Sequence, residues 1–191
     1  SMPLGDNRLA VRVTPVSLNA GSLDDSARDR FGGGPQATLD NPGMSPGSQK
    51  DSGVGLAVAF ENPGVGLKAD IGTTPQGFLY STAVGGVSVE RAVPGNPDLH
   101  WNVGVSRRAV TDSVLSYAGL KDAYTGQTWG GVVLNTASAR IAGETDTGWD
   151  LSAQASWGLY TGKNVASNQR MQVRTTAGTD VWRTPFQRVY A

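Results

Sequence analysis

Apolar and polar residues alternate one by one along much of this chain. The clearest run covers residues 149–159, where tryptophan, leucine and alanine fill the odd positions and aspartate, serine, glutamine and glycine fill the even ones. A period of two residues predicts a strand with one apolar and one polar face. The same alternation, in places weaker, recurs over residues 8–15, 53–60, 65–71, 84–91, 99–106, 131–139 and 171–181. The sequence therefore predicts eight strands and no long helix.

The connections between these segments differ in length in a regular way. Long connections at 20–52, 73–83 and 107–130 alternate with short ones near 61–64, 94–97 and 143–147, and a medium loop is expected at 161–168. Transmembrane barrels have short periplasmic turns and longer outer loops, whereas a soluble sandwich has no reason to sort its loops by end. The pattern predicts an all-β, antiparallel up-and-down transmembrane barrel, with the first strand rising from the periplasm.

Charged and amide side chains occupy the polar face of the expected strands. Burying so many of them in a dry core would cost several kcal/mol each, so this face must meet water. It either points outward from a soluble sheet or inward to a hydrated lumen. We interpret it as a lumen lining and keep a soluble β-sandwich as the alternative. The lumen-facing candidates are Arg12, Lys68, Asp70, Glu90, Asp150, Gln154 and Arg174.

Two tryptophans on the apolar face fit the lumen interpretation. Trp149 and Trp157 are eight residues apart, roughly 26 Å along a strand at about 3.3 Å per residue. Allowing for strand tilt, this spacing puts one indole near each membrane interface, as aromatic girdles require. Simple packing of either ring is the alternative.

Composition narrows the function classes. Glycine, at 26 of 191 residues, argues against a helical bundle, and no apolar run reaches the 18 or more residues of a transmembrane helix. Lysine plus arginine equals aspartate plus glutamate, which argues against a nucleic-acid partner. The chain lacks cysteine and has one histidine, His100, so we expect no metal site, no cofactor and no catalytic residues.

The most distinctive stretch is the long connection at 107–130, which combines arginines, hydroxyls, carboxylates and aromatic rings. A loop of this length is usually functional or disordered. Aromatic faces beside hydrogen-bonding groups suit sugar rings. The candidate polysaccharide contacts are Arg107, Arg108, Tyr117, Asp122 and Trp129. Alternatively, the loop folds back and braces the barrel through Arg107, Arg108 and Asp112.

The segment RRAVTDSVLSYAGLKDAYTGQTWGGV (107–132) resembles the C-terminal region of the bacterial cellulose synthase operon protein C family. Supporting matches follow in the expected order, among them DIGTTPQGF (70–78), VGGV (84–87) and YTGK (160–163). The resemblance implies a porin-like barrel in the outer membrane of a Gram-negative cell, through which nascent cellulose is exported during cellulose biosynthesis and biofilm formation. It also implies three partners: the glucan chain, outer-membrane lipid, and the inner-membrane synthase complex, reached through periplasmic tetratricopeptide repeats that this sequence lacks.

Complete outer-membrane barrels of this kind finish on a strand with a terminal aromatic residue, whereas this chain stops at Ala191, just after an expected turn at Thr184 and Pro185. We therefore expect residues 1–191 to form one barrel domain that is the first part of a larger barrel. The predicted function is a passive conduit for exported cellulose, not an enzyme. Two alternatives remain: a soluble carbohydrate-binding sandwich, and a glycan-processing enzyme, which would need a carboxylate pair across a cleft.

Overall fold

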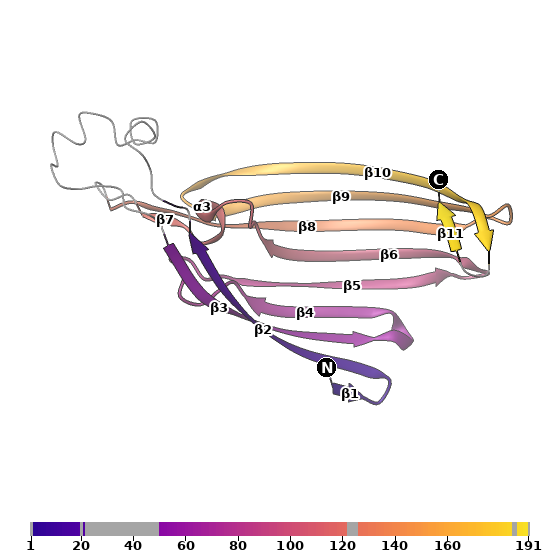
Figure 1. Ribbon diagram of the computed structural model, residues 1–191, viewed down its shortest axis with the longest axis horizontal. Helices are drawn as coiled ribbons and strands as arrows, with labels where there is room; N and C mark the ends of the chain where they lie inside the picture. Colours follow the sequence, from indigo (N-terminus) through magenta and orange to yellow (C-terminus); the bar gives the residue numbers. More distant parts are fainter. Residues whose placement is uncertain (1, 20, 22–49, 122–125, 185–186, 191) are drawn as a thin grey trace.

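A computed structural model describes residues 2–19, 21, 50–121, 126–184 and 187–190, and nearly all of them lie in antiparallel strands (Figure 1). The strands are β1 (Met2–Leu4), β2 (Asn7–Asn19), β3 (Lys50–Asn62), β4 (Leu67–Thr73), β5 (Ala83–Val93), β6 (Asn96–Ala109), β7 (Leu120–Lys121), β8 (Thr128–Glu144), β9 (Trp149–Lys163), β10 (Val165–Thr184) and β11 (Gln187–Tyr190).

These strands form a single sheet in chain order. Each pairs with the next, except that β6 pairs with β8, and β7 pairs with β8 beside this path. The eight strands of seven or more residues in the described part of the chain are β2–β6 and β8–β10, and they coincide with the eight predicted segments. The sheet runs from β1 to β11 without closing on itself. The antiparallel up-and-down fold is therefore confirmed, and two packed sheets, as in a sandwich, do not occur among the described residues.

Turns of different kinds gather at the two ends of the sheet. One end, here called the short-turn end, carries the connections β3–β4, β5–β6 and β8–β9 (Figure 1). The opposite end, here called the loop end, carries the connections β2–β3, β4–β5 and β6–β8. Most of residues 20–52 lie outside the described residues. The sorting of long and short connections by end thus matches the prediction at these six places.

The expected medium loop at 161–168 is wrong. Strand β9 continues to Lys163 and β10 starts at Val165, so only Asn164 separates them, and its backbone is left-handed (φ 50°). Asparagine tolerates this conformation better than most residues, which permits a tight turn. Pairing with β8 on one side and β10 on the other keeps the flanking residues extended. The strands of 15 and 20 residues are consequently longer than predicted.

Strand β6 also extends further than expected. It reaches Ala109, and Arg107 and Arg108 pair with Asn135 and Leu134 of β8. Both arginines therefore lie in a strand and not in the loop that follows it. Cross-strand hydrogen bonds fix this boundary, and the local sequence pattern does not carry that information.

Helical structure is limited to short pieces. Helix α3 (Val114–Tyr117) starts at a capping box formed by Ser113 and Ser116, and the 3-10 turn η1 (Pro63–Val65) starts at Asn62. Within the described ranges, we find no helix with both the length and the apolar character needed to span a membrane.

The few buried side chains lie where the loops meet and not across the sheet. Among the described residues they are Thr74, Pro75, Phe78, Ala118 and Val133. Little of either broad face of the described sheet is therefore buried.

Candidate functional site

Strand register sorts the side chains onto two faces. Residues directly opposite each other on paired strands point to the same side of a sheet. Following these pairs from β2 to β10 shows that all seven predicted lumen-facing residues share one side, which we call the hydrophilic face. The opposite side, which includes Val11, Ile71, Val105, Trp157 and Val173, is the apolar face.

The hydrophilic face carries both signs of charge in balance. Along β2–β6 and β8–β10, its cations are Arg8, Arg12, Lys68, Arg108, Arg140, Arg170 and Arg174. Among the side chains that the structure describes, its carboxylates along the same strands are Asp51, Glu61, Asp70, Glu90, Asp98, Glu144 and Asp150. Such a surface is strongly hydrated and has little net attraction for either sign of ion.

Five polar side chains form a line across the hydrophilic face. Successive register pairs connect Glu90, Asn102, Arg140, Gln154 and Arg174, from β5 to β10; we call this line the polar row. Neighbouring strands are about 4.8 Å apart, so the row offers a polar group at each such step. Four of its members line a hollow of about 1110 Å³. Sequence reasoning missed Asn102 and Arg140, although both continue the alternation of the predicted strands.

The space beside the polar row is kept open by small residues. The next register line towards the loop end contains Ser88, Gly104, Ser138 and Ser156. No ion pair or side-chain hydrogen bond joins the members of the polar row, as far as the structure describes the chain. The hydrogen-bonding groups of the row therefore remain open to groups from outside the described residues.

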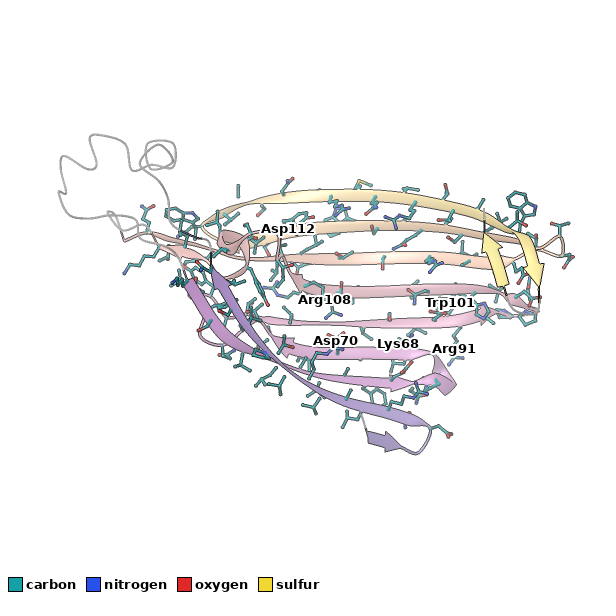
Figure 2. All side chains as sticks on the ribbon, viewed as in Figure 1. Lys68, Asp70, Arg91, Trp101, Arg108 and Asp112 are labelled. Atoms are coloured by element: carbon teal, nitrogen blue, oxygen red, sulfur yellow. The ribbon has the colours of Figure 1, made fainter. Side chains whose placement is uncertain are left out.

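On the part of the hydrophilic face nearer β2, several charged side chains form ion pairs. Arg108 donates two hydrogen bonds to the Asp70 carboxylate, with 2.6 Å between Nη2 and Oδ1 (Figure 2). The arginine reaches from β6 to β4 across Gly86 of β5, where an added Cβ would lie 3.1 Å from Nη2. Lys68 and Arg8 approach Glu61 at 3.8 and 3.7 Å.

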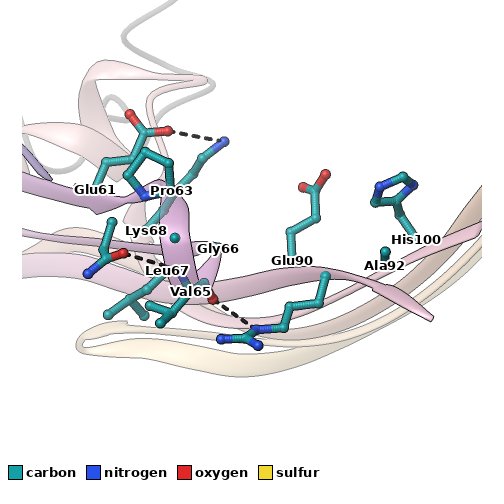
Figure 3. A pocket seen from close by; sticks show the side chains of 12 residues that line it. Glu61, Pro63, Val65, Gly66, Leu67, Lys68, Glu90, Ala92 and His100 are labelled. Carbon is teal, nitrogen blue, oxygen red and sulfur yellow. Dashed lines mark hydrogen bonds and ion pairs between the residues drawn. The ribbon is translucent and has the colours of Figure 1, made fainter. Parts of the chain in front are cut away.

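A second hollow, of about 510 Å³, lies at the short-turn end (Figure 3). Glu61, Lys68, Glu90 and His100 line it together with the turn of η1. Across the described residues, no three His, Cys, Asp or Glu side chains gather as a metal site would need. The hollow is a polar rim where the hydrophilic face meets the short turns.

At the loop end, two connections pack against each other. The Phe78 and Tyr117 rings meet edge to face, 5.1 Å apart, and the Tyr80 hydroxyl donates to Thr128. Burial raises the pKa of the Tyr117 phenol above its usual range. The connection after β4 lies over the hydrophilic face, because a Cβ at Gly53 would come within 3.0 Å of Pro75. We call this packed region the loop cluster: residues 74–82 and 113–119.

The predicted sugar contacts fall in different places. Tyr117 belongs to the loop cluster, and half-buried Trp129 pairs with Leu120 of β7. Arg107 lies on the apolar face, where it donates to the Ala83 carbonyl and to Asn135. Arg107 thus braces the neighbouring strands β5 and β8, and Arg108 ties β6 to β4 across β5, whereas Asp112 is exposed. Asp122 lies outside the described residues, and sugar contact at the other four stays a prediction.

Large apolar side chains cover the opposite face and remain bare. Val11, Ile71, Met171 and Val173 are 67–83% exposed. Trp149 and Trp157 are 45% and 44% exposed on the same face of β9. No segment that the structure describes covers this surface.

An antiparallel meander with one hydrated face and one bare apolar face defines the class of up-and-down sheets found in barrels. The chain belongs to the family described as "Cellulose synthase operon protein C C-terminus", whose profile matches residues 1–191. This confirms the resemblance noted from residues 107–132.

Curated relatives carry the same description. The chain is 47% identical over 173 residues to "Cellulose synthase operon protein C" of Pseudomonas fluorescens (strain SBW25), covering 90% of this chain and 13% of that protein. It is 33% identical over 180 residues to the protein of that name from Escherichia coli (strain K12), covering 91% and 15%. It is 32% identical over 192 residues to "Cellulose synthase operon protein C" of Komagataeibacter xylinus, covering 94% of this chain and 14% of that protein. The chain thus spans about a seventh of the length of these relatives.

Proposed function

We propose that this chain forms part of an outer-membrane pore that exports nascent cellulose from the periplasm to the cell exterior. The observation that carries the proposal is the separation of the sheet into two faces. One face is charged and open to water, and the other is apolar, exposed and uncovered. Lipid on the outside and a water-filled lumen on the inside satisfy both faces at once.

The height of the apolar face supports a bilayer as its partner. On the apolar side of β9, Trp149 and Trp157 are separated by roughly 26 Å along the strand at about 3.3 Å per residue. With the tilt of about 40° that is usual in barrels, this is roughly 20 Å of membrane depth, near the ~25 Å apolar band of known barrels. We take the short-turn end as the periplasmic side.

The hydrophilic face suits transport of a neutral, hydrated polymer. Its balanced charges offer no deep electrostatic well, and the polar row offers repeated exchangeable hydrogen-bond groups beside small residues. A conduit must bind weakly at many positions, because one tight site would stall the chain. We therefore propose a passive path without catalysis.

The two edges of the sheet are open to pairing with further strands. Strands β1 and β11 end the sheet order, and open edges invite pairing with further strands. We propose that residues 1–191 belong to one barrel domain that further strands of the full-length protein complete. The proposed partners are the glucan chain, outer-membrane lipid, and the inner-membrane synthase complex, reached through periplasmic repeats that precede the barrel.

Adjacent residues on opposite faces of β8 give a matched test of the pore. Ser138 lies on the hydrophilic face, and Ala139 lies next to it on the apolar face. A Ser138→Trp substitution in the full-length protein should lower both single-channel conductance in a planar bilayer and cellulose release by cells, because the indole narrows the lumen. The Ala139→Trp variant adds the same ring towards lipid and should leave both unchanged. Equal effects of the two substitutions, or none from Ser138→Trp, would contradict the proposal.

A glycan-processing enzyme is the second candidate, because two carboxylates, Asp112 and Asp122, flank α3 in the sequence. Hydrolysis needs a carboxylate pair about 5–9.5 Å apart. Cellulose secretion that is normal in the Asp112→Ala and Asp122→Ala variants, with glucan chain length unchanged, would remove this candidate.

A further inference from the structure

Charges on the apolar face are of one sign only. Within β2–β6 and the described parts of β8–β10, the charged residues on that side are Lys50, Arg91, Arg107 and Lys163. All the carboxylates of these strands lie on the hydrophilic face. Three of the four cations lie near the loop end, and Arg91 lies near the short-turn end. An apolar surface bordered by cations at both ends matches an amphiphile whose polar end is anionic.

Arg91 is the cation whose guanidinium is best placed for an outside ligand. Its Nε donates to the Val65 carbonyl at 3.2 Å, the interaction drawn at Val65 in Figure 3. The η1 turn that supplies this carbonyl is held against β5 by the hydrogen bond from the Glu90 amide to Gly66. The side chain is exposed, and Nη1 and Nη2 make no hydrogen bond within the described ranges.

Arg107 offers a contrast at the other end of the same face. It uses Nε on the Ala83 carbonyl, Nη1 on Asn135 and Nη2 on Thr82, and it is half-buried. All these donors of Arg107 form hydrogen bonds within the protein. Nη1 and Nη2 of Arg91, in contrast, form none within the described ranges, and this pair of nitrogens can bind two oxygens of one anion in parallel.

The surroundings of Arg91 identify the kind of anion. Trp101 is its direct partner on β6, and both residues lie near the short-turn end in Figure 2. Val89 and Val103 pair one step further towards the loop end on the same face, and Val103 is 45% exposed. A ligand there meets a guanidinium, then an indole, then bare apolar surface. This is the order of a phosphate, a glycerol backbone and acyl chains.

We propose that Arg91, with Trp101 beside it, binds the phosphate of a glycerophospholipid in the leaflet at the short-turn end. This inference rests on the proposed membrane placement of the apolar face. The guanidinium fork holds two phosphate oxygens while the acyl chains lie along the Val89 and Val103 side of the sheet. A bound lipid of this kind would fix the depth of the sheet in the bilayer.

The test compares two arginines on opposite faces. The full-length protein in a nonionic detergent is titrated with phosphatidylglycerol, or with diacylglycerol that has the same acyl chains and no phosphate, and bound lipid is counted by native mass spectrometry. Arg91→Gln should weaken phosphatidylglycerol binding about fivefold or more and leave diacylglycerol binding unchanged. The Arg91→Lys variant keeps the charge but lacks the guanidinium fork. It should bind phosphatidylglycerol more weakly than the native protein and more tightly than Arg91→Gln.

Arg170→Gln is the matched control, because Arg170 is an exposed arginine of β10 on the hydrophilic face. Equal phosphatidylglycerol binding by the Arg91→Gln variant and the native protein, or an equal loss in Arg170→Gln, would overturn the inference. Displacement of the lipid by millimolar inorganic phosphate would mark a free-anion site and also overturn it. If any of these three results is found in a protein that inserts and conducts normally, the proposed pore still stands. A native protein that stays in the aqueous phase would overturn both.

Discussion

At the scale of single residues, the pair of Asp70 and Arg108 joins strands that are not neighbours. Arg108 spans β5 at Gly86 to reach β4, so the contact locks three strands in register. The sequence predicts Asp70 at a polar position of a strand and Arg108 in the connection at 107–130, and their pairing depends on a register between distant segments. Local periodicity contains no such information. The polar alternation was predictable for this reason, and the ion pair was not.

Breaking this pair should cost measurable stability. In urea unfolding of the protein in detergent micelles, a double-mutant cycle of Asp70→Asn and Arg108→Gln should give a coupling free energy of about 1 kcal/mol, because the pair is bidentate but partly exposed. The exposed carboxylate of Asp150 serves as the control: a cycle of Asp150→Asn with Arg108→Gln should give no coupling. A coupling near zero for Asp70 would show that the contact does not hold the register.

At the scale of elements, the loop cluster depends on glycines that let two connections approach closely. Gly119 has a left-handed backbone (φ +94°), and a Cβ there would lie 2.8 Å from the Tyr80 ring. Gly119→Ala should therefore loosen the cluster, costing about 1–3 kcal/mol from backbone strain and overpacking. Hydrogen exchange at the amides of α3 and Tyr80 should become faster.

Gly126 supplies the matched control for this substitution. Its backbone is also left-handed (φ +70°), but nothing lies within 4 Å of an added Cβ. Gly126→Ala should therefore carry the backbone strain alone and leave exchange in α3 nearly unchanged. Similar acceleration in both variants would mean that the ring contact is not what orders the cluster.

The elements also show where prediction from sequence ends. Eight strands follow from alternation because a period of two is local and survives in each segment. The strand ends do not follow from it, since Arg107 is held extended by pairing with β5 and β8, and Lys163 by pairing with β8. Glycine, lysine and asparagine commonly occur in loops, so the sequence predicts a loop at 161–168 where the structure has a tight turn at Asn164. The polar row was recognised in part, through Glu90, Gln154 and Arg174.

At the scale of the whole molecule, the described part of the sheet buries few side chains and exposes many large hydrophobic ones. Its buried side chains lie in and beside the loop cluster, and its largest exposed hydrophobic residues cover one continuous face. Lipid contact along that face would replace the missing second layer of an ordinary domain. The central claim is therefore that acyl chains cover the apolar face while water fills the other side.

Spin labels at four successive positions of β10 test this claim most directly. The chain contains no cysteine, so single cysteines can be introduced at Met171, Gln172, Val173 and Arg174. In lipid vesicles, labels at 171 and 173 should be accessible to oxygen and protected from a water-soluble nickel complex. Labels at 172 and 174 should show the reverse. Water-like accessibility at 171 and 173 in the membrane-bound protein would contradict the account.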